Sequence, residues 1–517
     1  MITTFPEIIS YRAETHPDRA AYIFNEEVFS YKNYYEKSLQ AACHLKSLGL
    51  QKGDRFGILD LNNPNVLHLI SGAMLAGIIP VCINWRAMPG ELLFVLQDAG
   101  IDHLFYGTAF QKLIDASTLP QNLHIYETGK PDVENKNCDE NFLKNIQIHD
   151  ADICTLLYTS GTTGNPKGVM LSYKNLFTCY HLCVSDTPSF GPDTRNLVCG
   201  PMYSIFGFGA FFAGIYAGCT NVVIMMFDAQ QVCKNIVAHS VSNALLIPAM
   251  FQMILKIDGI DQMDFSSLRH IQYGGSPVSG EILKQMKNTF QCYFTQVYGL
   301  TESGGVGTAL RFDDHEEILN ANDSSKNAKL FSAGKPGIGI EIKLNEAVYH
   351  DEYKYETGEI FIRGENIANG YWNMTQLTSE VFDKDGWLHT GDIGYINEEG
   401  YLFLVDRMND KIVCKGVNMY PAEIEKVLMQ FKGFSEVAVI GVPDEKAGEA
   451  ICAVAVFSDH NISLETLQHW CEGKLASHKI PKRLEKVEAL PRNPTGKVLR
   501  RILREPFWKN ESRKIKG

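Results

Sequence analysis

The chain has 517 residues, of which 45% are hydrophobic and 21% charged, and its formal net charge is −12. A chain of this length exceeds one ordinary core, so two or more domains are expected. The composition is ordinary for a soluble globular enzyme, and the acidic balance argues against a nucleic-acid partner, which favours a basic surface.

Cysteine usage and hydropathy predict a cytoplasmic protein. The thirteen cysteines include no Cys-x-x-Cys pair, and a scattered, odd count predicts reduced thiols rather than a disulfide framework or a zinc site. No basic-then-apolar signal opens the chain, and no targeting tripeptide ends it. Residues 197–227 carry no charge, but Pro201 and five glycines interrupt them, which predicts a buried helix and strand instead of a transmembrane segment.

Apolar periodicity in the first part of the chain predicts alternating helices and strands. This alternation indicates a parallel sheet that is covered on both faces. A polar stretch over residues 127–151 is expected to be a surface excursion. The predicted strands are residues 21–24, 29–31, 54–60 and 78–83, and the predicted helices are residues 5–12, 31–48, 64–77 and 89–98.

The alternation of helices and strands continues beyond residue 151, and from about Gly334 the pattern changes to short strands and turns. Residues 313–328, rich in Asp, Glu, Asn and Ser, are expected to form a mobile loop. The predicted fold class is α/β. An N-terminal domain (1–405) would hold αβαβα-type parallel-rich sheets and a β-rich subdomain (334–405), and a small mobile α+β domain (406–517) would follow a hinge at Asp406. The predicted elements here are strands 153–158, 221–226, 244–247, 270–275, 294–299 and 436–442, and helices 229–240 and 421–430.

Residues 158–169, Tyr-Thr-Ser-Gly-Thr-Thr-Gly-Asn-Pro-Lys-Gly-Val, lead from a predicted strand into a glycine-rich loop. Glycine N–H groups can close around an anion, hydroxyl groups add donors, and Lys167 adds a positive charge. The order of the common P-loop is excluded, because Lys167 is followed by Gly168 and not by Ser or Thr. The stretch predicts a loop that binds a nucleotide polyphosphate. Its candidate residues are Thr159, Ser160, Gly161, Thr162, Thr163, Gly164 and Lys167.

Five further motifs follow in order. They are Tyr-Gly-Gly-Ser-Pro at 273–277, Tyr-Gly-Leu-Thr-Glu at 298–302, Trp-Leu-His-Thr-Gly-Asp at 387–392, Asp-Arg-Met-Asn-Asp-Lys-Ile-Val-Cys-Lys-Gly at 406–416 and Pro-Arg-Asn-Pro-Thr-Gly-Lys at 491–497. The six motifs together resemble those of the adenylate-forming (AMP-binding) superfamily, of the acyl-CoA synthetase or fatty-acid–CoA ligase type. The resemblance covers nearly the whole chain.

The resemblance implies a site for ATP and Mg²⁺. A carboxylate beside a triphosphate is repelled unless a cation intervenes, and Mg²⁺ prefers one or two carboxylates plus phosphate oxygens. Thr159 and Glu302 would hold the metal, and Thr301 would approach the α-phosphate. The adenine would lie on a wall made by Gly274, Gly275 and Ser276, with Tyr298 and Gly299 beside it. Asp392 and Arg407 would bind the ribose diol.

The resemblance also implies two half-reactions at one site. Lys497 would stabilise the charge that builds up as a carboxylate attacks the α-phosphate. The C-terminal domain would then rotate about Asp406 and bring the loop at 411–421 to the site. In that second pose Gly416 would let pantetheine pass close to the backbone, and Lys415 would contact CoA.

The stretch that begins at Pro201 indicates which class of carboxylic acid the enzyme would activate. Ser204 stands where many relatives have a histidine near the acyl carboxylate, which puts a histidine-gated pocket in doubt. Residues 205–212 contain no charged side chain, which argues against an amino acid because an unpaired buried ammonium is costly. A fatty acid is the first choice and an aromatic acid the second, while the chain length cannot be read. The candidate pocket residues are Tyr203, Ser204, Phe206, Phe208 and Ile247.

Several alternatives stay open at this point. The acyl group could pass to free CoA or to the phosphopantetheine of a carrier protein, and a homodimer is neither required nor excluded. A luciferase-like oxidoreductase lacks support, because no feature indicates oxygen chemistry. A non-catalytic AMP-binding regulator would be expected to lose Lys497 or Glu302, and both are present.

Overall fold

A computed structural model of the chain shows two compact units. The larger unit comprises residues 1–342 and 362–389, and the smaller unit comprises residues 343–361 and 390–517. The predicted hinge at Asp406 concerns a movement between two poses and stays a prediction. The structure describes residues 2–129, 143, 145–159, 165–185, 190–276, 278, 280–320, 329–350, 354–407, 410, 412–414, 417–444, 448–458, 462–475, 477–492 and 498–508.

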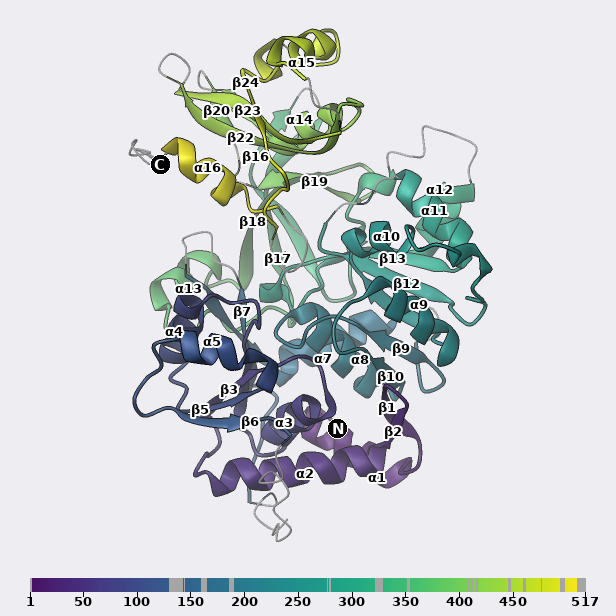
Figure 1. Cartoon of the computed structure of the whole chain (residues 1–517), viewed down its shortest axis with the longest axis vertical. Helices are drawn as coiled ribbons and strands as arrows, with labels where there is room; N and C mark the ends of the chain where they lie inside the picture. Colours follow the sequence, from purple (N-terminus) through teal and green to yellow (C-terminus); the bar gives the residue numbers. More distant parts are fainter. Residues whose placement is uncertain are drawn as a thin grey trace. The chain divides into compact units, whose positions relative to one another are not determined.

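A six-stranded sheet in the larger unit has the order β6-β5-β3-β4-β7-β8 and is parallel except for the β7–β8 hairpin. Alternate residues of its strands face two different cores. Ile58 and Phe105 pack on the side of helices α2 and α3, whereas Leu59 and Leu104 pack on the side of α4 and α5 (Figure 1). The elements are α2 (Tyr31–Ser47), β3 (Arg55–Leu59), α3 (Pro64–Leu75), β4 (Ile79–Cys82), α4 (Pro89–Asp98), β5 (His103–Tyr106), η1 (Thr108–Phe110), α5 (Gln111–Ala116), β6 (His124–Glu127), β7 (Ile153–Thr159) and β8 (Lys167–Ser172).

A nine-stranded sheet has the order β15-β14-β13-β12-β11-β9-β10-β1-β2. The run from β13 to β1 is parallel, and antiparallel strands close both ends. The strands are β1 (Ala20–Phe24), β2 (Glu27–Ser30), β9 (Arg195–Val198), β10 (Thr220–Val223), β11 (Asn243–Leu246), β12 (His270–Gly274), β13 (Tyr293–Tyr298), β14 (Thr308–Leu310) and β15 (Lys335–Pro336). The other helices of this unit are α1 (Phe5–Thr15), α7 (Tyr173–Ser185), α8 (Ile205–Ala217), α9 (Ala229–Ala238), α10 (Pro248–Ile254), η3 (Ile260–Gln262), α11 (Gly280–Phe290), η4 (Thr301–Ser303), α12 (Phe312–Asn320) and α13 (Thr375–Val381).

A ladder of buried polar side chains crosses five parallel strands of this sheet. The amide of Asn196 donates to Asn221 Oδ1 at 3.0 Å, and the amide of Asn243 donates to Asn196 Oδ1 at 2.8 Å. His270 extends the ladder, with Nδ1 3.0 Å from Asn243 Oδ1 and Nε2 3.0 Å from Thr295 Oγ1. A shift of one residue in any strand would leave buried polar groups unpaired, so the ladder fixes the strand register. It thereby fixes where β12 and β13 end.

The uncharged segment 197–227 forms helix α8 and strand β10, as expected. No helix in the described part of the chain is both long and apolar enough to cross a membrane. The prediction of reduced thiols is wrong at Cys43, which is disulfide-bonded, whereas ten other cysteines of the described residues are free, most of them buried.

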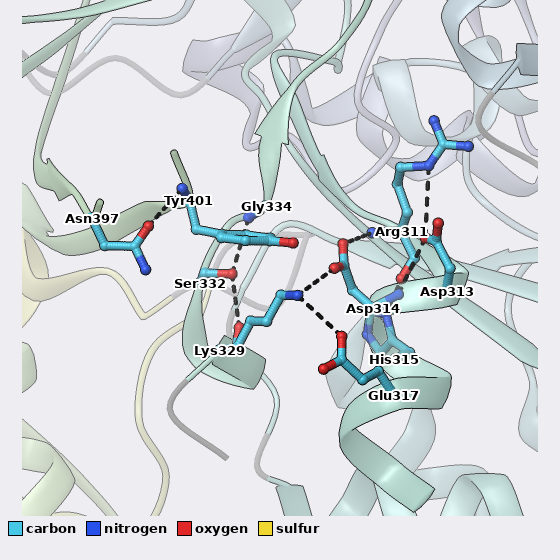
Figure 2. A network of polar contacts seen from close by, with 10 residues as sticks. All are labelled: Arg311, Asp313, Asp314, His315, Glu317, Lys329, Ser332, Gly334, Asn397 and Tyr401. Carbon is cyan, nitrogen blue, oxygen red and sulfur yellow. Dashed lines mark hydrogen bonds and ion pairs between the residues drawn. The ribbon is translucent and has the colours of Figure 1, made fainter. Parts of the chain in front are cut away.

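The mobile loop expected over residues 313–328 is wrong in its first part, where helix α12 forms. His315 is buried and its Nε2 lies 2.8 Å from the Tyr273 hydroxyl. Lys329 pairs with Asp314 at 2.7 Å and with Glu317 at 3.5 Å (Figure 2). Acidic residues in the first turn also complement the helix dipole. An acidic composition alone does not distinguish such a helix from a mobile loop, and residues 321–328 lie outside the described ranges.

The smaller unit contains most of a four-stranded sheet, β16-β17-β18-β19, and a five-stranded sheet in which β21-β20-β23-β22 is joined by β24 beside β23. Its aromatic residues Tyr355, Tyr395 and Phe403 stack across neighbouring strands. The elements are β16 (Glu341–His350), β17 (Tyr355–Arg363), β18 (Trp387–Ile396), β19 (Leu402–Arg407), β20 (Ile412–Cys414), β21 (Val417–Met419), α14 (Pro421–Leu428), β22 (Phe434–Asp444), β23 (Gly448–Phe457), α15 (Leu464–Cys471), η7 (Ser477–Lys479), β24 (Arg483–Lys486) and α16 (Arg500–Trp508). The α/β fold class with parallel-rich sheets, a β-rich part and a small C-terminal part is confirmed.

Candidate functional site

The predicted phosphate loop spans the turn of the β7–β8 hairpin. Thr159 and Lys167 are register partners, so they stand opposite each other at the base of the loop. A Cβ atom on Gly168 would lie 2.9 Å from the ring of Tyr158, so a larger residue there would force this ring to shift. The predicted loop residues Ser160, Gly161, Thr162, Thr163 and Gly164 lie outside the described residues. The hairpin therefore defines the stem of the loop, and the phosphate contacts stay a prediction.

Thr301 and Glu302 lie in the short turn η4, which follows strand β13. The buried Ser303 braces this turn, because its hydroxyl accepts from the Leu300 N–H at 3.0 Å. The amide of Asn366 donates to the Ser303 carbonyl at 3.0 Å. These contacts fix the backbone before and after Glu302.

Tyr371 brings Glu302 and Lys167 to one place, although the three residues are far apart in the sequence. Its hydroxyl donates to Glu302 Oε1 at 2.7 Å. The Lys167 Nζ atom lies over its ring, 5.2 Å from the centroid. Burial, followed by the charge of Glu302, raises the pKa of Tyr371 well above its usual value, so the phenol stays protonated as a donor.

The side chains here suit Mg²⁺ and a polyphosphate. Glu302, Thr301 and Thr159 offer oxygen atoms, the type of ligand that Mg²⁺ prefers, and Lys167 offers positive charge. Among the described residues no three His, Cys, Asp or Glu side chains are grouped as a metal cage would need. A single carboxylate fits the other mode of Mg²⁺ binding, in which phosphate oxygens complete the coordination.

The predicted adenine wall lies at the ends of the neighbouring strands β12 and β13. Gly274 pairs with Val297, and a Cβ atom at Gly274 would lie 2.4 Å from the Val297 carbonyl oxygen. Gly275 has φ +83°, which favours glycine, and a Cβ there would meet only Ile247 Cγ2, at 3.9 Å, within the described part of the chain. Ser276 follows this open glycine surface. A flat ring could therefore approach the backbone at Gly275.

Strand β13 connects this wall to the turn that carries Glu302. Tyr298 ends the strand and is buried. Gly299 follows, and a Cβ atom on it would lie 2.5 Å from the backbone of Gly305. The structure thus places Tyr298, Gly299, Thr301 and Glu302 on one short connection beside the glycine wall, which sequence order alone also implied.

The predicted ribose residues lie in the smaller unit. Asp392 and Arg407 are register partners on β18 and β19, and Asp392 is 7% exposed. The predicted residues Lys415, Gly416 and Lys497 lie outside the described residues. Their roles stay predictions.

An ion-pair cluster in the smaller unit was not predicted. Arg500 begins helix α16, three positions after Lys497, and pairs with Asp410 at 3.0 Å and Glu425 at 2.7 Å. Its side chain is 15% exposed. The cluster anchors the start of α16. Arg500 is followed directly by Arg501, and the sequence carries no signal for which of them makes this contact.

The predicted acid pocket is centred on the turn before helix α8. Ser204 caps the helix, because its Oγ atom accepts weakly from the Gly207 N–H at 3.4 Å and donates to the Pro201 carbonyl at 2.9 Å. Tyr203 is buried and contacts Trp85 edge-on, with ring centroids 6.3 Å apart. Burial raises the pKa of Tyr203 to about 12.

Asn62 holds this turn and was missed by the sequence reasoning. Its amide donates to the carbonyls of Gly200 at 2.8 Å and Ile224 at 3.1 Å, and its Oδ1 accepts from the Met202 N–H at 3.2 Å. Asn62 follows strand β3, so it ties the six-stranded sheet to the ends of β9 and β10. Asn-Asn-Pro after a strand resembles an ordinary helix start, which hides this role.

The other three predicted pocket residues occupy different surroundings. Phe208 is fully buried and packs against Phe212, with ring centroids 4.7 Å apart. Phe206 lies beside Gly200, where an added Cβ would come within 2.3 Å of its ring. Ile247 lies beside Gly275. The structure therefore puts Ile247 next to the adenine wall and Phe208 in the core, and the acid contacts of all three stay predictions.

Comparison with known proteins places the chain in a family. The model of the AMP-binding enzyme family matches residues 9–372, and the model of the AMP-binding enzyme C-terminal domain matches residues 423–497. The chain is 32% identical to the fatty acid–[acyl-carrier-protein] ligase ScoC of Streptomyces coeruleorubidus, over 99% of this chain and 98% of the relative. It is also 32% identical to the long-chain-fatty-acid–CoA ligase FadD13 of Mycobacterium tuberculosis, over 96% and 97%.

Solved structures agree with this assignment. The o-succinylbenzoate CoA synthetase of Bacillus subtilis in complex with its acyl-adenylate intermediate superposes with a TM-score of 0.83 at 29% identity, covering 97% of this chain and 98% of the other. The same protein in complex with ATP and magnesium superposes with a TM-score of 0.81, covering 96% and 98%. The chain therefore belongs to the AMP-binding enzyme family, the adenylate-forming superfamily, and is a ligase of the acyl-CoA synthetase type.

Proposed function

We propose that this ligase activates an apolar carboxylic acid, with a fatty acid as the first choice, and transfers the acyl group to CoA. The observation that carries the proposal is that Lys167 and Glu302 both contact Tyr371, beside the predicted adenine wall at the ends of β12 and β13. Such a combination of cation, carboxylate and open backbone suits the triphosphate and base of ATP.

The first half-reaction joins two anions and needs positive charge at the phosphates. A carboxylate oxygen attacks the α-phosphorus, a new acyl–O–P bond forms, and the bond to pyrophosphate breaks. Lys167 and Lys497 would stabilise the charge that develops on the phosphoryl oxygens. Thr159 and Glu302 would hold Mg²⁺, which when bound neutralises part of the phosphate charge. Asp392 and Arg407 would hold the ribose, so that the nucleotide cannot shift during attack.

The second half-reaction uses the activated acid. The sulfur of a thiol attacks the acyl carbon, a thioester forms, and AMP leaves with the bonding electrons of the acyl–O bond. We propose that the part of the chain after Asp406 rotates between the two steps, so that Lys497 serves the first and the loop with Lys415 and Gly416 serves the second.

The apolar character of helix α8 supports an apolar acid. No residue of Ile205–Ala217 is charged, and its first turn carries Phe206, whose ring packs closely against Gly200. An amino acid would bring an ammonium group that no charged side chain of this helix could pair. The fatty-acid ligases among the relatives agree with this choice by name, whereas the Bacillus subtilis relative is named for o-succinylbenzoate.

The proposal is tested by AMP release from ATP across a panel of acids, with and without CoA. The panel should contain straight-chain fatty acids of increasing length, benzoate and o-succinylbenzoate. We expect release to peak on fatty acids and to rise when CoA is added. A peak on the aromatic acids would make an aromatic acid the preferred substrate. AMP release at the same rate with and without an added acid would contradict the proposal.

A carrier protein is the second candidate acceptor. The similarity over nearly the full length to a fatty acid–[acyl-carrier-protein] ligase favours it. The same assay separates the two acceptors when a phosphopantetheine-bearing carrier protein replaces CoA. Acyl transfer to the carrier, together with no effect of free CoA on AMP release, would identify the carrier as the acceptor.

A further inference from the structure

A segment over residues 365–373, which we call the strap, lies along the strand that leaves the phosphate loop. The N–H of Asn369 donates to the Met170 carbonyl at 2.9 Å, and the N–H of Met170 donates to the Gly370 carbonyl at 3.0 Å. The N–H of Trp372 donates to the Gly168 carbonyl at 2.8 Å. The strap therefore pairs with β8 through an isolated antiparallel bridge between Val169 and Tyr371.

The other side of the strap is bonded to the turn that carries Glu302. The N–H of Ala368 donates to the Glu302 carbonyl at 2.8 Å. The Asn366 amide donates to the carbonyls of Ser303 at 3.0 Å and Val306 at 2.7 Å. One continuous segment thus connects the phosphate-loop strand to the turn η4, through the backbone of Ala368 and the side chain of Asn366.

Tyr371 lies near the C-terminal end of the strap and is 5% exposed. Its backbone N–H donates to Thr378 Oγ1 at 2.9 Å, which fixes its position along the chain. Its hydroxyl donates to Glu302 Oε1, and its ring face receives Lys167. Tyr371 therefore contacts the carboxylate and the cation through two different parts of one rigid side chain.

We propose that Tyr371 is a positioning residue for nucleotide binding, which orients the Glu302 carboxylate toward Mg²⁺ and keeps Lys167 available for the phosphates. This inference rests on the proposed function, in which Glu302 holds Mg²⁺ and Lys167 approaches ATP.

The physical reason lies in what the two charges would otherwise do. Glu302 and Lys167 both approach Tyr371, yet the ion pairs found among the described residues do not join them. A direct pair would occupy the carboxylate needed for the metal and the ammonium needed for the phosphates. A neutral phenol satisfies Oε1 with one hydrogen bond and leaves the negative charge in place, so Oε2 can face a cation.

The test is calorimetric titration of ATP at several Mg²⁺ concentrations, without any acid, so that binding is measured without turnover. The variant Tyr371→Phe keeps the ring and removes the hydroxyl. We expect its affinity for ATP without Mg²⁺ to stay within about twofold of the wild type. The Mg²⁺ concentration that gives half of the affinity gain should rise about tenfold, as for loss of a hydrogen bond to a charged group.

Two further variants make the result specific. Tyr31→Phe is the matched control, because Tyr31 is also buried and its hydroxyl donates to the Cys219 carbonyl at 2.9 Å, far from η4 and β8 in the sequence. It should leave the Mg²⁺ dependence unchanged. Tyr371→Leu removes the ring as well, so it should also weaken ATP binding without Mg²⁺, because Lys167 loses its ring contact.

The outcomes distinguish a failure of the positioning role of Tyr371 from a failure of the proposed function. If wild-type protein binds ATP more tightly with Mg²⁺ and Tyr371→Phe shows the same Mg²⁺ dependence, the positioning role is overturned and the proposed function stands. An equal loss of affinity with and without Mg²⁺ in Tyr371→Phe would also overturn it. If the wild type shows no Mg²⁺-dependent ATP binding, both the proposed metal role of Glu302 and the inference fail.

Discussion

The nucleotide region and the acid region of the larger unit use polar groups in different ways. Around Glu302 some polar side chains contact one another, as in the hydrogen bond from Tyr371 at 2.7 Å, while Ser303 and Asn366 bond to the backbone of the turn. Around Ser204 they bind the backbone, since Asn62 and Ser204 both bond to main-chain groups of the turn at 200–204. The first region therefore presents charge to a ligand, whereas the second presents shape. Substitutions should accordingly affect chemistry in one region and substrate fit in the other.

The largest effect is expected from Lys497→Ala. Loss of this charge should lower the rate of adenylate formation about 100- to 1000-fold, as for removal of one group that stabilises a transition state. Thioester formation from supplied acyl-adenylate should be largely unaffected, because that step would use the other pose. Single-turnover assays of each half-reaction measure both rates. An equal loss in the two half-reactions would contradict the proposed rotation about Asp406.

A loss of about 100-fold in kcat/KM is expected from Glu302→Gln. The amide keeps the size of the side chain and can still accept from Tyr371 through its oxygen, but it lacks the charge that Mg²⁺ needs. The loss should be partly recovered at high Mg²⁺ and should leave KM for the acid unchanged within twofold. Steady-state kinetics at several Mg²⁺ concentrations would show this. A change confined to the acid KM would mean that Glu302 belongs to the other region.

Much of the fold could be predicted because the periodic segments are long. Helices α2 and α3 lie where the apolar pattern placed them, and both begin after a capping residue, Ser30 and Asn63. Helix α12 was missed because its stability depends on partners distant in the sequence. Composition cannot reveal that His315 reaches Tyr273 or that Lys329 reaches Asp314.

The sequence predicts the nucleotide region of the candidate site better than the acid region. The motif residues Glu302 and Lys167 carry charge in a recognisable order, and the structure brings them to one tyrosine. Tyr371 itself carries no such signal, because its partners are 69 and 204 positions away by number. In the acid region, Phe206 and Phe208 look alike in the sequence, yet only Phe208 is fully buried in the core. A pocket wall and a core use the same residue types.

The acid region is tested next by Asn62→Ala. The substitution removes three hydrogen bonds and leaves buried groups of Gly200, Ile224 and Met202 unpaired, which should lower the free energy of unfolding by about 2–4 kcal/mol. We expect KM for the acid to rise about fivefold to tenfold while KM for ATP stays within twofold. Initial-rate kinetics with each substrate varied, together with denaturant unfolding, give the three quantities.

Asn63→Ala is the matched control for this change. Asn63 is the neighbouring asparagine and caps helix α3 by accepting from the Val66 N–H at 3.1 Å. Its loss should cost about 1 kcal/mol of stability and leave both KM values unchanged. If both variants raise the acid KM equally, the effect comes from general destabilisation and not from the turn that Asn62 holds.

The smallest effect is expected from Ser204→Ala, and it tests whether the Ser204 hydroxyl contacts the acid. In the structure the hydroxyl of Ser204 is engaged within its own turn, since it donates to Pro201 and caps α8. If capping is its whole role, alanine should cost about 1 kcal/mol of stability, change the acid KM less than twofold and leave the ranking of the acids unchanged. Thermal unfolding and the acid panel measure these effects. A rise in the acid KM of tenfold or more would show that the hydroxyl also contacts the substrate, and the acid region would then contribute polar chemistry as the nucleotide region does.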